Sequence, residues 1–141
     1  LDARGSYLMA RILLAMIADD MPDAVGGLSL GADPIVGAIL ALAGMEDLEL
    51  KGFMVRKEQK DHGTKSLVEG PLSKGNRVVI IEDVITTGGS SMKAIKAVEE
   101  LGCTVAKVIA VVDRQQGARE NLTKAGYRLE SVFTVDELLK I

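Results

Sequence analysis

Apolar residues are arranged in two ways along this chain. Short β-branched runs, such as Val-Val-Ile-Ile at 78–81, have the pattern of strands buried on both faces. Other segments repeat apolar residues at helical spacing. The pattern predicts strands at residues 25–30, 52–55, 67–71, 78–81, 105–112 and 128–133, and helices at 6–20, 34–43, 91–101, 118–125 and 135–139. This alternation predicts an α/β fold, with a mainly parallel central sheet flanked by helices, in a single domain over residues 1–141.

Two of these helices also indicate which residues should be buried. In the helix at 6–20, apolar pairs recur every four residues, and its methionines are expected to fill gaps in the core. The pairs are Leu8/Met9, Ile12/Leu13 and Met16/Ile17. The helix at 91–101 is expected to bury Ile95, Val98 and Leu101 and to end at Gly102.

Polar residues that could bind a ligand follow the run at 78–81 directly. Glu82 and Asp83 follow at once, and the turn Thr-Thr-Gly-Gly-Ser at 86–90 opens the next helix. Backbone N–H groups of such a turn, with the helix N-terminus, form an anion site. The neighbouring acids suit hydroxyl groups or a hydrated metal, so the combination fits a phosphorylated ribose. The segment is neither GxGxxG nor a P-loop, which disfavours the two commonest nucleotide-binding motifs. An ordinary buried strand followed by a polar loop is the plainer alternative.

This segment resembles the phosphoribosyl-diphosphate-binding signature of type I phosphoribosyltransferases. The resemblance implies their fold, with a mobile catalytic loop, and assigns ribose hydroxyls to the two acids and the 5′-phosphate to the turn. The implied substrate-binding residues are Glu82, Asp83, Val84, Ile85, Thr86, Thr87, Gly88, Gly89 and Ser90. The stretch GLSLGADPI at 27–35 also looks like the pyrophosphate loop of that family. Many members have a lysine where this chain has Gly31, so contact would be made by backbone N–H groups. A plain strand–turn–helix corner remains an equal alternative for this stretch.

Residues 56–65 contain no apolar side chain, and a solvated charged loop is the simplest interpretation. However, RKEQKDHG within it resembles the mobile catalytic loop of orotate phosphoribosyltransferases. Arg56, Lys57, Lys60 and His62, the only histidine, occupy the matching places. The resemblance assigns these cations to the leaving pyrophosphate. It makes Lys57, Lys60 and His62, together with Asp83, the expected catalytic residues.

The strand at 105–112 ends in Asp-Arg-Gln-Gln-Gly at 113–117. An arginine just past a parallel strand faces the ligand edge of the sheet. DRxxG is also similar to orotate phosphoribosyltransferases, where the arginine pairs with the carboxylate of orotate, a role that suits a planar bidentate donor. Arg114 is therefore the expected base-binding residue. A surface arginine in a turn is the alternative.

Composition narrows the possible partners and compartment. The net charge of -3 argues against nucleic acid as the main partner. Cys103 is the single cysteine, so it cannot form an internal disulfide. It is expected to be a small core residue in a protein of the reducing cytoplasm. The absence of a run of about 18 apolar residues argues against a membrane location.

The resemblance extends from Gly27 to about Leu139 and implies an orotate phosphoribosyltransferase of pyrimidine biosynthesis. Its substrates would be phosphoribosyl diphosphate and orotate, and Mg²⁺ would be held mostly by substrate oxygens and water. The resemblance also implies a homodimer, in which the mobile loop of one subunit reaches into the active site of the other. One departure is that most of the N-terminal hood of the family is missing, and only LDARG resembles its closing D-x-R. Two alternatives stay open: a transferase for a purine base, and a non-catalytic regulator that senses the diphosphate or binds RNA.

Overall fold

The structure is a computed structural model that describes residues 2–59 and 66–141. Its strands are β1 (Ala24–Leu28), β2 (Lys51–Val55), β3 (Val68–Glu69), β4 (Arg77–Ile85), β5 (Thr104–Asp113) and β6 (Leu129–Thr134). Its helices are α1 (Ala3–Ala18), α2 (Asp33–Met45), α3 (Gly89–Glu100), α4 (Ala118–Lys124) and α5 (Val135–Leu139). Within the described ranges, no helix has the length and apolar character needed to cross a membrane.

The six strands form one sheet in the order β3-β2-β1-β4-β5-β6. All neighbours are parallel except β3, which pairs antiparallel with β2 at the edge. The chain builds outward from β1 to β3, then returns to place β4 on the other side of β1. Ligand crevices of open α/β sheets form at such a switch, outside the carboxyl ends of the strands. The expected mainly parallel α/β fold is confirmed, and the loops after β1 and β4 lie next to one another.

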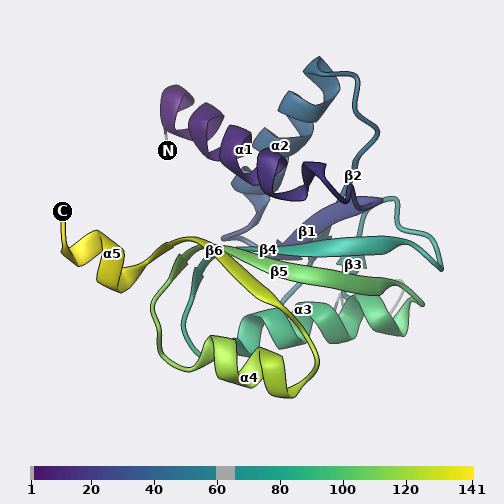
Figure 1. Cartoon of the computed structure of the whole chain (residues 1–141). Coiled ribbons are helices and arrows are strands. Elements are labelled where there is room, and N and C mark those ends of the chain that lie inside the picture. The colour runs from purple at the N-terminus through teal and green to yellow at the C-terminus, as the bar shows by residue number, and fades with distance from the viewer. Residues whose placement is uncertain (1, 60–65) are drawn as a thin grey trace.

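Helices cover both faces of the sheet (Figure 1), with α1 and α2 on one face and α3 and α4 on the other. The apolar run of β4 serves both layers, because side chains alternate along a strand. Val79 and Ile81 pack in the cluster under α1 and α2, whereas Val78 and Ile80 pack in the cluster under α3 and α4. All four are at most 1% exposed, as expected for a strand buried on both faces.

The buried stripe of α1 differs partly from the expected one. Ala10, Leu13, Leu14 and Ile17 are buried, which is the i, i+3, i+4, i+7 spacing of one helix face. Both methionines pack against this core as expected, but Leu8 and Ile12 are 50% and 40% exposed. The pairs therefore identified the helix correctly but included residues from its outer side.

The end of α3 shows a second correction. Ile95 and Val98 are buried as expected, but Leu101 is 38% exposed. Leu101 caps the helix instead of continuing it, so its side chain has left the buried stripe. Gly102 follows with φ +86°, the left-handed conformation that commonly ends helices and that glycine adopts without strain.

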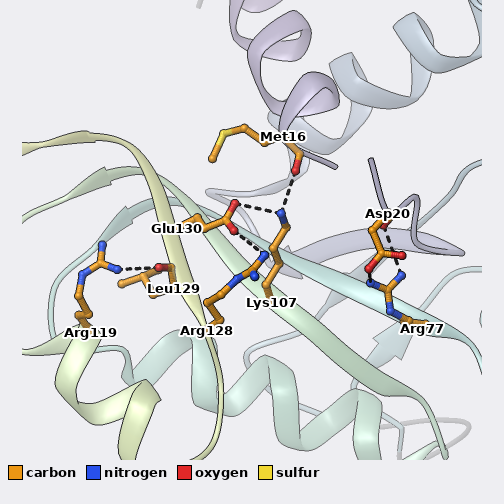
Figure 2. A network of polar contacts seen from close by, with 8 residues as sticks. All are labelled: Met16, Asp20, Arg77, Lys107, Arg119, Arg128, Leu129 and Glu130. Carbon is orange, nitrogen blue, oxygen red and sulfur yellow. Dashed lines mark hydrogen bonds and ion pairs between the residues drawn. The ribbon is translucent and has the colours of Figure 1, made fainter. Parts of the chain in front are cut away.

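Polar contacts attach α1 to the sheet (Figure 2). Lys107 of β5 donates a 2.8 Å hydrogen bond to the carbonyl of Met16 in the last turn of α1, and pairs at 2.9 Å with Glu130 of β6. Arg128 pairs with the other oxygen of Glu130 at 2.6 Å. A carbonyl at a helix C-terminus lacks an intrahelical partner, and a lysine is a favourable one. This network fixes the end of α1 over β5 and β6.

Candidate functional site

The turn between β4 and α3 forms an anion site. Gly88 precedes the helix with φ +94°, and no described side chain caps the first turn, which also contains no acidic residue. The first N–H groups of α3 are therefore available to an anion, which the helix dipole also favours. A hollow of about 210 Å³ lies here, lined by Glu82, Val84, Ile85 and residues 86–90. The structure thus brings together the residues expected to hold the phosphate.

Glu82 lies beside this anion site but is buried, with 5% of its surface exposed. The hydroxyl of the fully buried Ser91, in the first turn of α3, donates a 2.8 Å hydrogen bond to its Oε1. Burial raises the pKa of Glu82 above its ordinary value; the bond from Ser91 opposes this increase, and the charge of Asp83 adds to it. The surroundings of Glu82 therefore favour its protonated form more than water would.

Asp83 points in the opposite direction, towards the loop after β1. A Cβ atom built on Gly31 would lie 2.7 Å from its Oδ2 and 2.8 Å from its Oδ1. The N–H of Val84 donates to Oδ1 at 2.8 Å. The two acids diverge because β4 continues to Ile85, and neighbouring side chains of a strand face opposite sides. The expectation that the strand ends before the acids is therefore wrong.

The loop after β1 adjoins the start of the charged segment after β2. The N–H of Ser29 donates to the carbonyl of Val55 at 2.9 Å, and its hydroxyl donates to Asp33 at 3.1 Å. A hollow of about 300 Å³ here is lined by Ser29, Leu30, Arg56, Lys57 and Glu58. The expected pyrophosphate loop and the first two expected cations therefore share one hollow.

The arrangement of these cations is partly defined by their contacts. Arg56 pairs with Glu69 of β3 at 2.9 Å, and Lys93 of α3 donates to the backbone carbonyl of Lys57. Lys60 and His62, which were expected to be catalytic, lie outside the described residues.

Arg114 lies in the loop after β5, beside the phosphate turn. Its N–H donates to the carbonyl of Ile85 at 3.0 Å, and its side chain is exposed. The preceding Asp113 is 2% exposed and accepts a 2.8 Å hydrogen bond from the N–H of Gln115. The loop is thus held by a buried carboxylate while the guanidinium group remains available to a ligand.

Sequence reasoning missed three features of this site. Ser91 was given no role, although it stands at helical spacing with the buried residues Ala94, Ile95 and Val98, a signal that could have identified it. Asp113 was noted only as part of DRxxG, and its burial was not expected. An apolar hollow of about 330 Å³ also lies between the starts of α1 and α2, and Asp83 and Val84 of β4 are among the residues that line it. It joins elements distant in sequence, so no local pattern indicates it.

The carboxylates of this site determine how it could hold a metal ion. Among residues 2–59 and 66–141, no group of three His, Cys, Asp or Glu side chains has the arrangement of a metal site. Asp83 is an exposed carboxylate next to the loop, a single hard oxygen donor of the kind that Mg²⁺ accepts alongside water and phosphate oxygens. The site therefore fits an ion brought mainly by its substrate, and not one held in a protein cage.

Comparisons with known proteins identify the class to which this fold and site correspond. The chain belongs to the phosphoribosyl transferase domain family, whose sequence model matches residues 3–137. Within it, the chain is a member of the orotate phosphoribosyltransferases. It is 49% identical over 138 residues to the orotate phosphoribosyltransferase of Aquifex aeolicus, an alignment that covers 98% of this chain and 75% of that protein.

Solved structures give the same result. The orotate phosphoribosyltransferase of Mycobacterium tuberculosis H37Rv in complex with Fe(III) dicitrate matches with a TM-score of 0.87 and 40% identity, covering 98% of this chain and 77% of that one. The structure of that enzyme with 5-phospho-alpha-D-ribosyl 1-diphosphate matches with a TM-score of 0.83 and 38% identity, covering 96% and 76% of the two chains. The type I fold expected from the motifs is confirmed.

Proposed function

We propose that the protein transfers the 5-phosphoribosyl group from phosphoribosyl diphosphate to orotate, giving orotidine 5′-monophosphate and pyrophosphate for pyrimidine biosynthesis. The observation that carries the proposal is the meeting of three loops at the carboxyl edge of the sheet. The loop after β4 offers an anion site, the loop after β1 shares a hollow with two cations, and the loop after β5 presents Arg114. A substrate with a phosphate, a diol and a diphosphate, and a second with a carboxylate, match these groups.

In the proposed reaction, a ring nitrogen of orotate forms a bond to the anomeric carbon while the bond to pyrophosphate breaks. The ribose becomes oxocarbenium-like, and negative charge develops on the leaving group. Fixed cations aimed at that charge stabilise the transition state more than the ground state. Arg56 and Lys57 supply such cations at the pyrophosphate hollow, with Lys60 and His62 proposed to join them from the following loop. Glu82 and Asp83 would hold the ribose hydroxyls, and Arg114 the orotate carboxylate.

A magnesium ion belongs to this proposal as a companion of the substrate. It would be held mostly by diphosphate oxygens and water, with Asp83 available as a further carboxylate ligand, and would neutralise charge on the diphosphate. The proposal also places the protein in the cytoplasm, a reducing compartment that suits the buried free thiol of Cys103.

A turnover assay with orotate, hypoxanthine, adenine and uracil in parallel tests the function. Release of pyrophosphate with orotate alone is the expected result, and a preference for a purine base would contradict the proposal. Asp83→Asn should weaken diphosphate binding or turnover in a folded protein. Asp19→Asn, at the exposed end of α1, is the matched control and should behave as wild type. Unchanged kinetics of Asp83→Asn would remove this carboxylate from the site.

We further propose that the active form is a homodimer in which the loop at 56–65 carries Lys60 and His62 into the neighbouring subunit's site. Lys60→Ala and Asp83→Asn chains, each nearly inactive alone, should then recover activity when mixed. A mixed dimer would contain one site with an intact loop from one chain and an intact carboxylate from the other. Subunit exchange is verified by tagging one chain. Verified mixed dimers that stay as inactive as both parents would show that the loop acts within its own subunit.

A further inference from the structure

Glu69 of β3 forms an ion pair with one of the cations that line the pyrophosphate hollow. Its Oε1 lies 2.9 Å from a guanidinium nitrogen of Arg56, and the two side chains are 37% and 35% exposed. In the antiparallel pair of β2 and β3, Glu69 lies opposite Met54, and the N–H of Arg56 continues the ladder by donating to the carbonyl of Leu67 at 2.8 Å. Residues two apart along a strand share a face, so Arg56 and Glu69 are diagonal neighbours on one face of this pair.

The backbone that carries Glu69 is held close to β2 by the residue that follows it. Gly70 has φ +125°, and a Cβ atom on it would lie 2.7 Å from the carbonyl oxygen of Gly52 and 3.0 Å from the Cα of Phe53. Both obstacles are backbone atoms of β2, a strand anchored by the buried side chains of Phe53 and Val55. The backbone of Glu69 therefore has little freedom to move away from β2, and its carboxylate stays within reach of Arg56.

An arginine side chain has many rotamers, and ordering it when an anion binds costs free energy. Arg56 lines the hollow shared with the loop after β1, so an acid that already holds its guanidinium group reduces this cost. A guanidinium group carries five N–H donors, and a carboxylate on one nitrogen leaves donors for a second anion. We propose that Glu69 is a positioning residue, which holds Arg56 at the pyrophosphate hollow before the diphosphate binds. The inference rests on the proposed function, because it takes pyrophosphate as the anion of this hollow.

The test compares Glu69→Gln with the matched control Glu46→Gln, in the full chain. Glu46 pairs with Arg11 at 3.0 Å and is also partly exposed, but it lies at the end of α2 that is remote from the pyrophosphate loop. In Glu69→Gln, the KM for phosphoribosyl diphosphate and the Kd for pyrophosphate with Mg²⁺, measured by calorimetry, should rise about 2- to 10-fold. The KM for orotate and the urea midpoint should stay close to wild type, because a partly exposed ion pair contributes little to folding. Glu46→Gln should match wild type in the kinetic and binding measurements.

The direction of the change distinguishes positioning from a simple effect of charge. Removal of a nearby negative charge would by itself strengthen the binding of an anion. Weaker binding in Glu69→Gln is therefore the result that positioning predicts and that loss of charge alone does not. A lower Kd for pyrophosphate in this variant would show that the carboxylate competes with the anion for Arg56, and would overturn the proposal.

A double-mutant cycle tests whether Glu69 acts through Arg56. In an Arg56→Ala background, where no guanidinium group is left to hold, Glu69→Gln should change the Kd by less than about twofold. The proposal is also overturned if either single substitution leaves the Kd unchanged, or if Glu69→Gln raises it by the same factor in both backgrounds. Wild-type protein that binds pyrophosphate but does not use orotate would refute the proposed function, and calorimetry would still decide the role of Glu69.

Discussion

Removing the hydroxyl of Ser91 should destabilise the protein in a way that depends on pH. Ser91→Ala deletes the 2.8 Å hydrogen bond to the buried carboxylate of Glu82. A hydrogen bond to a charged group contributes about 1.5–3 kcal/mol, and one between neutral groups about 0.5–1.5 kcal/mol. The larger loss is expected where Glu82 is ionised in the folded protein, and the smaller loss where it is protonated.

The direction of the pH dependence follows from linkage. Burial raises the pKa of Glu82 above its ordinary value of 4.5, so the folded state binds more protons than the unfolded state above that pH. Its contribution to stability is therefore present at low pH and declines as pH rises through the folded pKa. The bond from Ser91 lowers this pKa, so its removal makes the decline larger. The free energy lost in Ser91→Ala should be greater at pH 8 than at pH 5.

Urea unfolding of wild type and Ser91→Ala at several pH values from 5 to 8 measures this difference. Ser90→Ala, an exposed neighbour in the same turn, controls for the general effect of losing a serine at the start of α3. The Glu82→Gln background provides the decisive comparison, because it has no carboxyl group at this position to titrate. A pH-independent loss in Ser91→Ala, or an equal pH dependence in Glu82→Gln, would refute the reasoning.

Three further predictions concern other contacts. Arg114→Ala should raise the KM for orotate about 10- to 100-fold and that for phosphoribosyl diphosphate far less, in line with loss of a charge-assisted bond; equal effects in steady-state kinetics would make the residue structural. Lys107→Met should lower the free energy of unfolding in urea by about 1–3 kcal/mol, because it leaves the Met16 carbonyl and Glu130 without this lysine. A loss below about 0.5 kcal/mol would contradict the role given to the network in Figure 2. Thr134→Ala, which removes the capping box of α5, should increase amide exchange in that helix while the core of the sheet remains protected; unchanged exchange would contradict this.

Sequence patterns predicted the fold well because its elements are encoded locally. The buried run at 78–81 has one physical interpretation, and Gly102 has the backbone freedom needed to end a helix. Burial on individual faces was less predictable. Leu8 and Ile12 are as apolar as their buried neighbours, and only the packing of α1 against the sheet determines which residues face outward. Propensity identifies the helix, but tertiary contacts select its buried face.

The site could be predicted as a set of residue types but not as an arrangement. The motif marked Glu82 and Asp83 as a pair, because they are adjacent and precede a phosphate turn. Extension of β4 through both residues depends on its pairing with β5, which begins 19 residues after β4 ends. The contact between Asp83 and Gly31 likewise joins separate segments of the chain. Neither arrangement has a signature in the local sequence.

The side chains of Glu82 and Asp83 point to opposite sides of β4, so these two adjacent acids have different surroundings. Glu82 faces α3, where burial raises its pKa and the Ser91 hydroxyl occupies one of its oxygens. Asp83 faces an exposed loop, where a neighbouring glycine leaves room for its carboxylate. A protonated Glu82 can donate a hydrogen bond to a ribose hydroxyl, whereas an ionised one can only accept. The strand therefore gives the two acids different neighbours, since Glu82 contacts α3 whereas Asp83 lies against the loop after β1. If Glu82 holds a ribose hydroxyl as proposed, Ser91→Ala should change the pH dependence that this acid gives to ribose binding, because the Ser91 hydroxyl lowers the pKa of Glu82.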